Sequence, residues 1–394
     1  MNRILLLATI FMLSSCYVFK AYRFRKFELQ DLPKLDAVPL PASPTPFSFA
    51  YDTSGNIPLV KYLDSNLISS NTYAFMVVKN DTILYERYFG DVTSSSRLPS
   101  FSVAKSFVST LVGIALHEGY IKSLTEPITN YLPKLLKNDK RFANITIQHV
   151  LDMRSGVRSN ENYTNPFSDV LKMGFANNVS KPAFNAGIET NPGEYEYKSV
   201  NTQLLALMVE KATGRKLQEY AIEKIWRPLG MEYDATWNAD KEKTVRAFCC
   251  INAAARDYAK FGRLFLKKGA WQGKQIVPEE WVNASVDADT MLKYNGYKNQ
   301  WWGRGTNIGF KDSSEASSFQ NSHPGSSEPF VWRMQDSNMY NARYYDGSFY
   351  AQGMLGQYVY VHPQKNLIIV RLGYNWSHPE FYAEGFIRDL LNKL

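Results

Sequence analysis

Two hairpin signals near opposite ends of the chain constrain its fold most strongly. The segment "YAFMVVKNDTILYERYFG" (73–90) holds two β-rich runs around Lys79-Asn80-Asp81, and "GQYVYVHPQKNLIIVRLGY" (356–374) turns at 362–366. An amphipathic helical pattern closes the chain at 379–394. Helical periods dominate the middle, at 103–118, 146–153, 200–212, 216–226 and 253–269. This order predicts an α+β fold, with one antiparallel sheet made from both chain ends, flanking helices and an inserted helical lobe at about 120–290.

Composition and charge narrow the class of protein. The 394 residues are 45% hydrophobic and 14% aromatic, which is enough to bury a large core. The net charge of +8 comes from scattered Lys and Arg, apart from a small cluster at Lys20, Arg23, Arg25 and Lys26. Because no basic stripe interleaved with aromatic residues occurs, we expect no nucleic-acid partner.

The N-terminus carries an export signal. In "MNRILLLATIFMLSSC", Arg3 precedes an apolar stretch that is too short to span a membrane, which predicts a signal peptide over 1–15. "LSSC" resembles the lipobox of bacterial lipoproteins. This resemblance implies lipidation of Cys16 and anchoring in the bacterial cell envelope, facing the periplasm or exterior. The alternative is a plain signal peptide with an incidental cysteine. The Pro-rich stretch over 16–47 then predicts an extended tether.

The remaining cysteines and the histidines show no pattern that requires a metal or cofactor. Cys249 and Cys250 are adjacent, and adjacent residues rarely meet disulfide geometry, so we expect a free pair. The five histidines show no spacing typical of a metal site or a catalytic triad. We therefore expect neither metal nor cofactor.

The best candidate for a nucleophile lies at the start of a predicted helix. Ser102 precedes a helix with Phe107 and Leu111 on its apolar face, so its Oγ and backbone N–H lie at the positive end of the helix dipole. Lys105 is its neighbour one turn on, and a desolvated lysine could act as its base. A chain with this many serines and lysines contains about one or two S-x-x-K sequences by chance. The alternative is a capping serine beside a surface lysine.

Several ordered segments favour the catalytic interpretation. The segments "FSVAKSFVSTLVGIALHEGYI" (101–121), "ITIQHVLDMRSGV" (145–157) and "YEYKSVNTQLLALMVEKATG" (195–214) resemble landmarks of the serine β-lactamase and penicillin-binding-protein superfamily. The closer resemblance is to its class C β-lactamase-like branch, which includes esterases and the 6-aminohexanoate-dimer amidase, and it extends over about 70–394. It implies a β-lactamase/transpeptidase-like catalytic domain over 48–394 and a serine hydrolase that cleaves a small ester or amide through an acyl-enzyme.

The resemblance also implies roles for individual residues. Ser102 would be the nucleophile, Lys105 the residue that activates it and Tyr197 a second proton shuttle. The backbone N–H near Ala351 would be a second oxyanion donor. In the second motif Ser199 stands where the family has an asparagine that orients the substrate, so substrate positioning is expected to differ.

The third motif of the family, Lys-Thr-Gly, is missing. "KATG" (211–214) is the end of a predicted helix, and Ser348-Phe349-Tyr350 stands in the place of the motif. A Lys–Thr pair would hold a substrate carboxylate, so its absence favours esters and amides without one. Arg343 is the candidate replacement for this clamp. Trp302 is a candidate for the pocket wall, with core packing as the alternative.

Two other functions stay open at this point. A D-alanyl-D-alanine carboxypeptidase or β-lactamase would use related chemistry. A catalytically silent binding protein would keep only the fold. The combination of Ser102, Lys105 and Tyr197 speaks against the silent protein, because a lysine kept beside a buried serine has little packing purpose.

Overall fold

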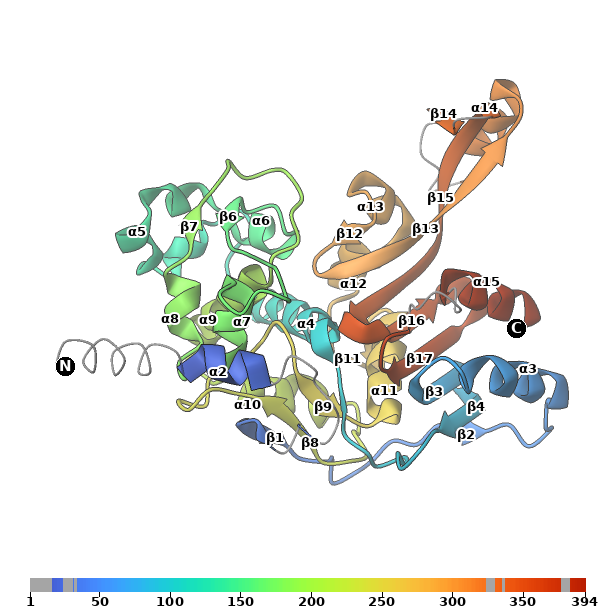
Figure 1. Cartoon of the computed structure of the whole chain (residues 1–394), viewed down its shortest axis with the longest axis horizontal. Coiled ribbons are helices and arrows are strands. Elements are labelled where there is room, and N and C mark those ends of the chain that lie inside the picture. The colour runs from blue at the N-terminus through green and yellow to red at the C-terminus, as the bar shows by residue number, and fades with distance from the viewer. Residues whose placement is uncertain (1–15, 24–30, 32–33, 324–329, 335–336, 377–382) are drawn as a thin grey trace, which may run out of the picture. The chain divides into compact units, whose positions relative to one another are not determined.

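The computed structural model describes residues 16–23, 31, 34–323, 330–334, 337–376 and 383–394. The chain forms two compact units (Figure 1). We call them the sheet unit and the helical unit. The sheet unit comprises the described residues within Ser43–Ser106, Arg227–Tyr233 and Ala253–Leu394, and the helical unit comprises those up to Ala42 and within Phe107–Trp226 and Asp234–Asn252. Each is described by itself.

A large sheet runs through the sheet unit and joins the two ends of the chain. Its strand order is β12-β13-β15-β16-β17-β3-β4-β2, and β14 also pairs with β15. Among the described residues, the strands of this sheet pair antiparallel except β2 with β4. Val77 on β3 lies opposite Ile369 on β17, which confirms that both ends of the chain build one sheet. The bounds are β2 Ala50–Tyr51, β3 Thr72–Lys79, β4 Thr82–Tyr88, β12 Tyr297–Lys298, β13 Trp301–Phe310, β14 Phe330–Met334, β15 Ser337–Gly353, β16 Gln357–His362 and β17 Leu367–Gly373.

The turn chemistry explains both hairpins. Asn80 and Asp81 connect β3 to β4 with φ values of 52° and 59°, and Asn366 precedes β17 with φ 47°. Asparagine and aspartate tolerate this left-handed region, which two-residue hairpin turns require. The two hairpins predicted at 73–90 and 356–374 are therefore confirmed.

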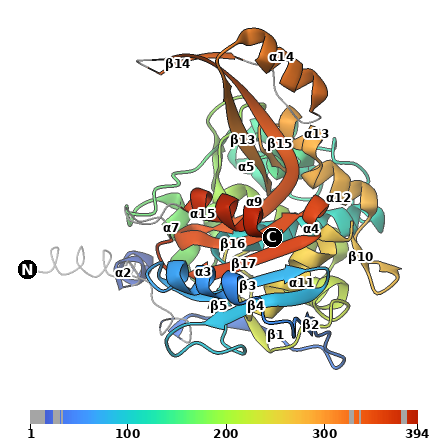
Figure 2. The ribbon, with the colours of Figure 1, turned by 90° about the vertical axis from the view of Figure 1, so that its right-hand side faces the viewer.

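Helices cover both faces of the central strands. On one face α3 (Ile57–Leu67) and α15 (Ala383–Lys393) pack their leucines against Phe75 and Ile369, as Figure 2 shows with both helices in front of the sheet. Each fully buried side chain of this size contributes about 1.5–3 kcal/mol. On the other face α11 (Ala255–Leu266) approaches so closely that a Cβ at Gly262 would lie 3.0 Å from the Ile368 side chain.

The remaining elements of the sheet unit lie around this core. A ribbon of β13 and β15 extends away from the central strands and carries α14 (Figure 1). The bounds are β5 Leu98–Pro99, β10 Ala270–Trp271, β11 Lys274–Gln275, α12 Glu279–Val286, α13 Ala288–Lys293 and α14 Ser313–Ser322.

The helical unit is built around α9 (Ser199–Thr213), which is buried along most of its length. Gly214 ends this helix with φ 69°, so "KATG" is a helix end as predicted. The helix α4 (Ala104–His117) begins in the sheet unit and continues into this one. Other bounds are β1 Ala37–Leu40, α5 Leu135–Asn138, α6 Ile147–Leu151, β6 Val157–Arg158, α7 Asp169–Phe175, α8 Ser180–Phe184, β7 Gly187–Ile188, α10 Leu217–Ala221, β8 Ala235–Asn238 and β9 Ile251–Ala253.

Three observations differ from the sequence predictions. In the stretch predicted as an extended tether, α2 (Cys16–Arg23) packs against α7, and β1 pairs with β8. The segment 253–290, predicted as part of the helical lobe, belongs to the sheet unit. Cys249 and Cys250 form a disulfide with each other, so the expected free pair is wrong. Cys250 has a φ of 78°, in the left-handed region, and the sequence gives no sign of this backbone conformation.

Candidate active site

Ser102 lies in a strained turn directly before α4. Phe101–Val103 forms a single 3₁₀ turn, in which the N–H of Val103 bonds to the carbonyl of Ser100 at 3.2 Å. Phe101 has φ 43°, a left-handed conformation that costs a bulky residue about 1–3 kcal/mol and persists only where surrounding contacts hold it. The strain is thus located at the residue that presents Ser102.

Lys105 lies beside Ser102 as the sequence predicts. Its Nζ donates a hydrogen bond of 3.0 Å to Ser102 Oγ. Only 1% of Lys105 is exposed, although lysine is among the residues least often buried. The alternative of a surface lysine is therefore wrong.

Contacts from a neighbouring hairpin hold the start of α4. Ser106 Oγ donates to the carbonyl of Gln300 at 2.8 Å. Gln300 and Asn299 form the turn between β12 and β13 with φ values of 64° and 46°. Asn299 Nδ2 in turn donates to Ser285 Oγ of α12 at 3.0 Å. Polar contacts of Ser106, the residue after Lys105, therefore fix the first turn of α4.

The strand predicted to supply an oxyanion donor ends at the turn that carries Ser102. A Cβ at Gly353 would lie 2.3 Å from the Ser100 carbonyl oxygen and 3.0 Å from the Phe101 Cβ. Ala351, two residues earlier on β15, is fully buried and lies opposite Val359. The end of β15 and the Ser102 turn are thus in direct contact, and the donor role of the Ala351 N–H stays a prediction.

Tyr258 anchors the chain just before this turn. Its hydroxyl donates to the Leu98 carbonyl at 2.9 Å. Burial raises the pKa of Tyr258 well above its ordinary value, so the phenol stays a donor at neutral pH. Because Tyr258 belongs to α11, the segment that leads into Ser102 is tied to the helix under the sheet.

Trp302 belongs to a row of aromatic rings on the sheet. It lies opposite Tyr350, and the two rings stack with centroids 6.4 Å apart and an interplanar angle of 6°. Tyr350 stacks on Tyr358 at 5.2 Å, and Tyr297 meets Trp302 edge-on at 4.6 Å. Trp302 is partly buried, so this row offers ring surface to both packing and solvent.

The structure does not bring Arg343 to the Ser102 turn. Arg343 lies on β15 eight residues before Ala351, which is about 26 Å along an extended strand. Its guanidinium donates to Asn307 Oδ1 at 3.3 Å and Asn295 Oδ1 at 3.1 Å. A carboxylate clamp formed by this arginine beside Ser102 is inconsistent with that placement.

Tyr197 and Ser199 lie in the helical unit at the start of α9. Tyr197 is partly buried. Ser199 is fully buried, its N–H donates to Glu161 Oε2 at 3.0 Å, and its Oγ is in close contact with Glu161 Oε1. Tyr163 also donates to Glu161 Oε1, at 2.6 Å, and burial, followed by the Glu161 charge, raises the Tyr163 pKa. The Ser199 hydroxyl predicted to position substrate is therefore already bonded to a carboxylate.

Glu161 and Tyr163 are absent from the sequence predictions. They lie in a loop without helical or strand period, and no motif points to them. A carboxylate at the N-terminus of a helix is stabilised by the helix dipole, so Glu161 fixes the first turn of α9 two residues after Tyr197. In the described ranges, no group of three or more His, Cys, Asp or Glu side chains could hold a metal ion.

An α+β fold with a serine and a buried lysine paired at the start of a helix defines a class of hydrolases. The chain belongs to the Beta-lactamase family, whose sequence pattern it matches over residues 69–390. It is 30% identical over 269 residues to the 6-aminohexanoate-dimer hydrolase of Paenarthrobacter ureafaciens, covering 63% of this chain and 68% of that protein. The family resemblance seen in the sequence is confirmed. The prediction of a hydrolase is confirmed to the extent that the chain belongs to this hydrolase family.

Solved structures confirm the fold class. A Bacillus anthracis protein provisionally described as a 6-aminohexanoate-dimer hydrolase matches with a TM-score of 0.66 at 23% identity, covering 94% of this chain and 93% of that one. A class C β-lactamase from Rhodobacter sphaeroides matches with a TM-score of 0.56 at 14% identity, covering 85% and 98%. At these identities the likeness establishes the β-lactamase/transpeptidase-like fold alone.

Proposed function

We propose that this chain is a serine hydrolase that cleaves a carboxylic ester or amide through an acyl-enzyme on Ser102. One observation carries the proposal, namely the 3.0 Å contact between Lys105 Nζ and Ser102 Oγ with the lysine buried. Serine is a weak nucleophile until a neighbouring base takes its proton. A buried amine in hydrogen-bond contact meets this need without histidine.

The proposed reaction has two halves. In the first, the neutral Lys105 amine takes the Ser102 proton while Oγ bonds to the substrate carbonyl carbon, and the backbone N–H groups of Ser102 and Ala351 hold the oxyanion. The bond to the leaving group then breaks, and the alcohol or amine departs with the proton that Lys105 has taken. The role of Tyr197 as a second proton shuttle stays a prediction. In the second half a water molecule gives up a proton to Lys105 and releases the acid, which restores Ser102.

The chemistry beside Ser102 favours substrates without a carboxylate at the clamp position. Ser348, Phe349 and Tyr350 replace the charged motif, and Phe349 is buried in contact with Trp301. The name of the relative from Paenarthrobacter ureafaciens indicates an amide substrate, which supports small amides beside esters. We accordingly assign the chain to the esterase and amidase side of the family.

We also propose a lipid anchor at Cys16, after removal of a signal peptide over 1–15. Arg3, the apolar stretch and "LSSC" support it. Residues 1–15 lie outside the described ones, and no helix within the described ranges is long and apolar enough to cross a membrane. A diacylglyceryl group and an amide-linked acyl chain on Cys16 would hold the protein at the bacterial cell envelope, facing the periplasm or exterior.

The test of the hydrolase is a comparison of rates. Wild type, Ser102→Ala and Ser109→Ala are assayed with p-nitrophenyl butyrate and a short amide. Ser109→Ala is the matched control, because it removes a buried hydroxyl of the same helix that has no bonding partner in the described structure. We expect Ser102→Ala to lose at least about 10³-fold in kcat/KM and Ser109→Ala to stay near wild type. A wild type without turnover of any ester or amide would favour the silent binding protein.

A further inference from the structure

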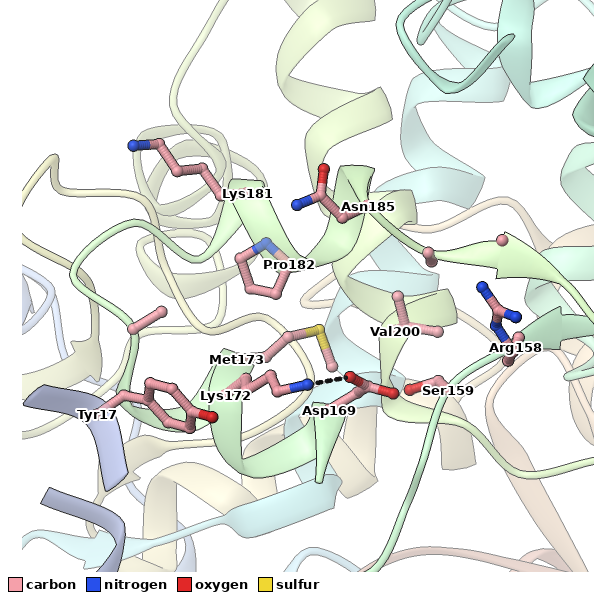
Figure 3. Close-up of a pocket in the computed structure, with 13 residues that line it drawn as sticks. Tyr17, Arg158, Ser159, Asp169, Lys172, Met173, Lys181, Pro182, Asn185 and Val200 are labelled. Atoms are coloured by element: carbon pink, nitrogen blue, oxygen red, sulfur yellow. Dashed lines mark hydrogen bonds and ion pairs between the residues drawn. The ribbon is translucent and has the colours of Figure 1, made fainter. Parts of the chain in front are cut away.

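A pocket lies within the helical unit. It encloses about 420 Å³, a size typical of small-molecule sites, and Ser102, Lys105 and Tyr197 are not among its lining residues. Its walls come from α2, α7, α8, the start of α9 and the β6–β7 pair (Figure 3). The catalytic proposal does not use it.

Positive charge predominates in this pocket. Arg158, Lys172 and Lys181 line it together with one acid, Asp169. The Asp169 carboxylate is already bonded, because it accepts from Lys172 Nζ at 3.0 Å and from the Asn160 N–H at 2.9 Å. Two cationic side chains are therefore left without a balancing acid among the lining residues.

The exposed Arg158 side chain lies over Gly187, its partner across the β6–β7 pair. A Cβ at Gly187 would lie 3.2 Å from Arg158 Nη2, so the guanidinium uses space that the missing side chain leaves open. Within the described residues, no acidic side chain forms an ion pair with Arg158. A guanidinium presented in this way can bind an oxyanion through two parallel hydrogen bonds.

Ser159 supplies a second, independent sign of a ligand. The residue is 6% exposed and lines the pocket, and its Oγ has no hydrogen-bond partner in the described structure. Buried hydroxyl groups are nearly always paired, so an unpaired one in the wall of a pocket is a donor that a bound ligand could use. Figure 3 shows Ser159 on the same side of the pocket as Arg158.

The rest of the lining is apolar. Met173, Pro182 and Val200 supply the apolar side chains of the lining (Figure 3). Tyr17 of α2 also lines the pocket, and α2 is held there by a hydrogen bond of 3.3 Å from Lys20 to Asn177. The pocket therefore combines cationic side chains with apolar ones.

We propose that this pocket binds a phosphate ester with a short stem, its phosphate oxygens accepting from Arg158 and Ser159 and its stem lying against Met173 and Val200. Tyr17 directly follows Cys16, so the headgroup of an anionic phospholipid is one source of such a group. That source rests on the lipid anchor proposed above. A soluble glycerol phosphate presents the same chemistry.

The test is calorimetric titration of the purified chain in its Ser102→Ala form, which keeps ester-containing probes from being hydrolysed. The probes are sn-glycerol 3-phosphate and monomeric dihexanoyl phosphatidylglycerol. We expect saturable binding of at least one, and the tighter of the two identifies the source. Arg158→Gln should weaken it by about tenfold, because it removes the guanidinium. Lys211→Gln, which removes an exposed charge elsewhere in the unit, should not change it.

The outcomes separate this proposal from the hydrolase proposal. Absence of saturable binding for both probes, or binding that Arg158→Gln leaves unchanged, would overturn the phosphate site. Arg158→Gln in the otherwise native chain should hydrolyse p-nitrophenyl butyrate at the wild-type rate. If Arg158→Gln lost both the hydrolysis of p-nitrophenyl butyrate and the binding of the phosphate probes, the pocket would serve the hydrolysed substrate. That result would also contradict a separate site.

Discussion

Gly353 lies so close to Ser100 that a single added methyl group would collide with the backbone: its carbon would be 2.3 Å from the Ser100 carbonyl oxygen. Gly353 has φ −121°, which any residue adopts, so the requirement for glycine here is the close approach itself. The end of β15 therefore sets the position of the turn that presents Ser102.

Gly353→Ala should displace that turn and reduce activity more than stability. We expect kcat/KM for p-nitrophenyl butyrate to fall at least about tenfold, because a small displacement of a nucleophile is costly, with a loss of about 1–3 kcal/mol in the free energy of unfolding from overpacking. Gly174→Ala on α7 is the control, since nothing lies within 4 Å of its added Cβ. Equal activity of the two variants would contradict the contact.

His149 should make the stability of the helical unit sensitive to acid. Its Nδ1 accepts a hydrogen bond of 3.2 Å from the Thr146 N–H in a capping box at the start of α6, and burial lowers the His149 pKa below 6.5. The folded state thus favours neutral His149, so this contribution is present above pH 6.5 and is lost as the pH falls through the lowered folded-state pKa.

His149→Gln tests this cap, because glutamine can form the same box without titrating. We measure the free energy of unfolding in urea at about pH 7.5 and about pH 5. Relative to wild type, the variant should be about 1 kcal/mol more stable at the lower pH than at the higher one. His117→Gln, at an exposed histidine, should follow wild type. Parallel profiles for wild type and His149→Gln would show that the cap does not titrate.

Esters and amides should be much better substrates than penicillin-like compounds. Without the Lys–Thr pair a substrate carboxylate loses charged hydrogen bonds worth about 1.5–3 kcal/mol each. We expect kcat/KM for p-nitrophenyl butyrate to exceed that for nitrocefin by at least about tenfold. Because Arg343 is bonded to Asn307 and Asn295, Arg343→Ala should leave this ratio unchanged. Efficient nitrocefin turnover that collapses in Arg343→Ala would identify a β-lactamase with a relocated clamp.

The anchor can be tested by metabolic labelling in a bacterial host. A palmitate analogue should label the wild type but not Cys16→Ser. A double variant of Cys249 and Cys250 to serine should still be labelled, because these two cysteines form a disulfide with each other. Labelling that persists in Cys16→Ser would remove the lipoprotein proposal.

Local chemistry made much of the fold predictable. The turn residues Asn80 and Asp81 and the alternating strands around them lie close together in sequence, as do Ser102 and Lys105 on one helix turn. The pairing of Trp302 with Tyr350 joins residues far apart in the chain, so no local period reveals it. The same holds for Ser106 with Gln300 and for Gly353 with Ser100.

The sequence likewise does not predict which side chains a loop residue contacts. The sequence does not reveal that the Ser199 hydroxyl bonds to a loop carboxylate, Glu161, and the substrate-positioning role of Ser199 stays a prediction. Arg343 was expected near the active serine, but the length of β15 carries it away. Both depend on where a strand or loop ends in space, which composition and spacing do not determine.

The central claim is a covalent bond to one serine, and peptide mapping of the trapped enzyme tests it most directly. Intact-protein mass spectrometry after treatment with a fluorophosphonate should show one added phosphonyl group, and fragmentation should place it on Ser102. Ser102→Ala should remain unmodified, while Ser109→Ala should be modified like wild type. A wild type that stays unmodified, or a modification that persists in Ser102→Ala, would contradict Ser102 as the nucleophile.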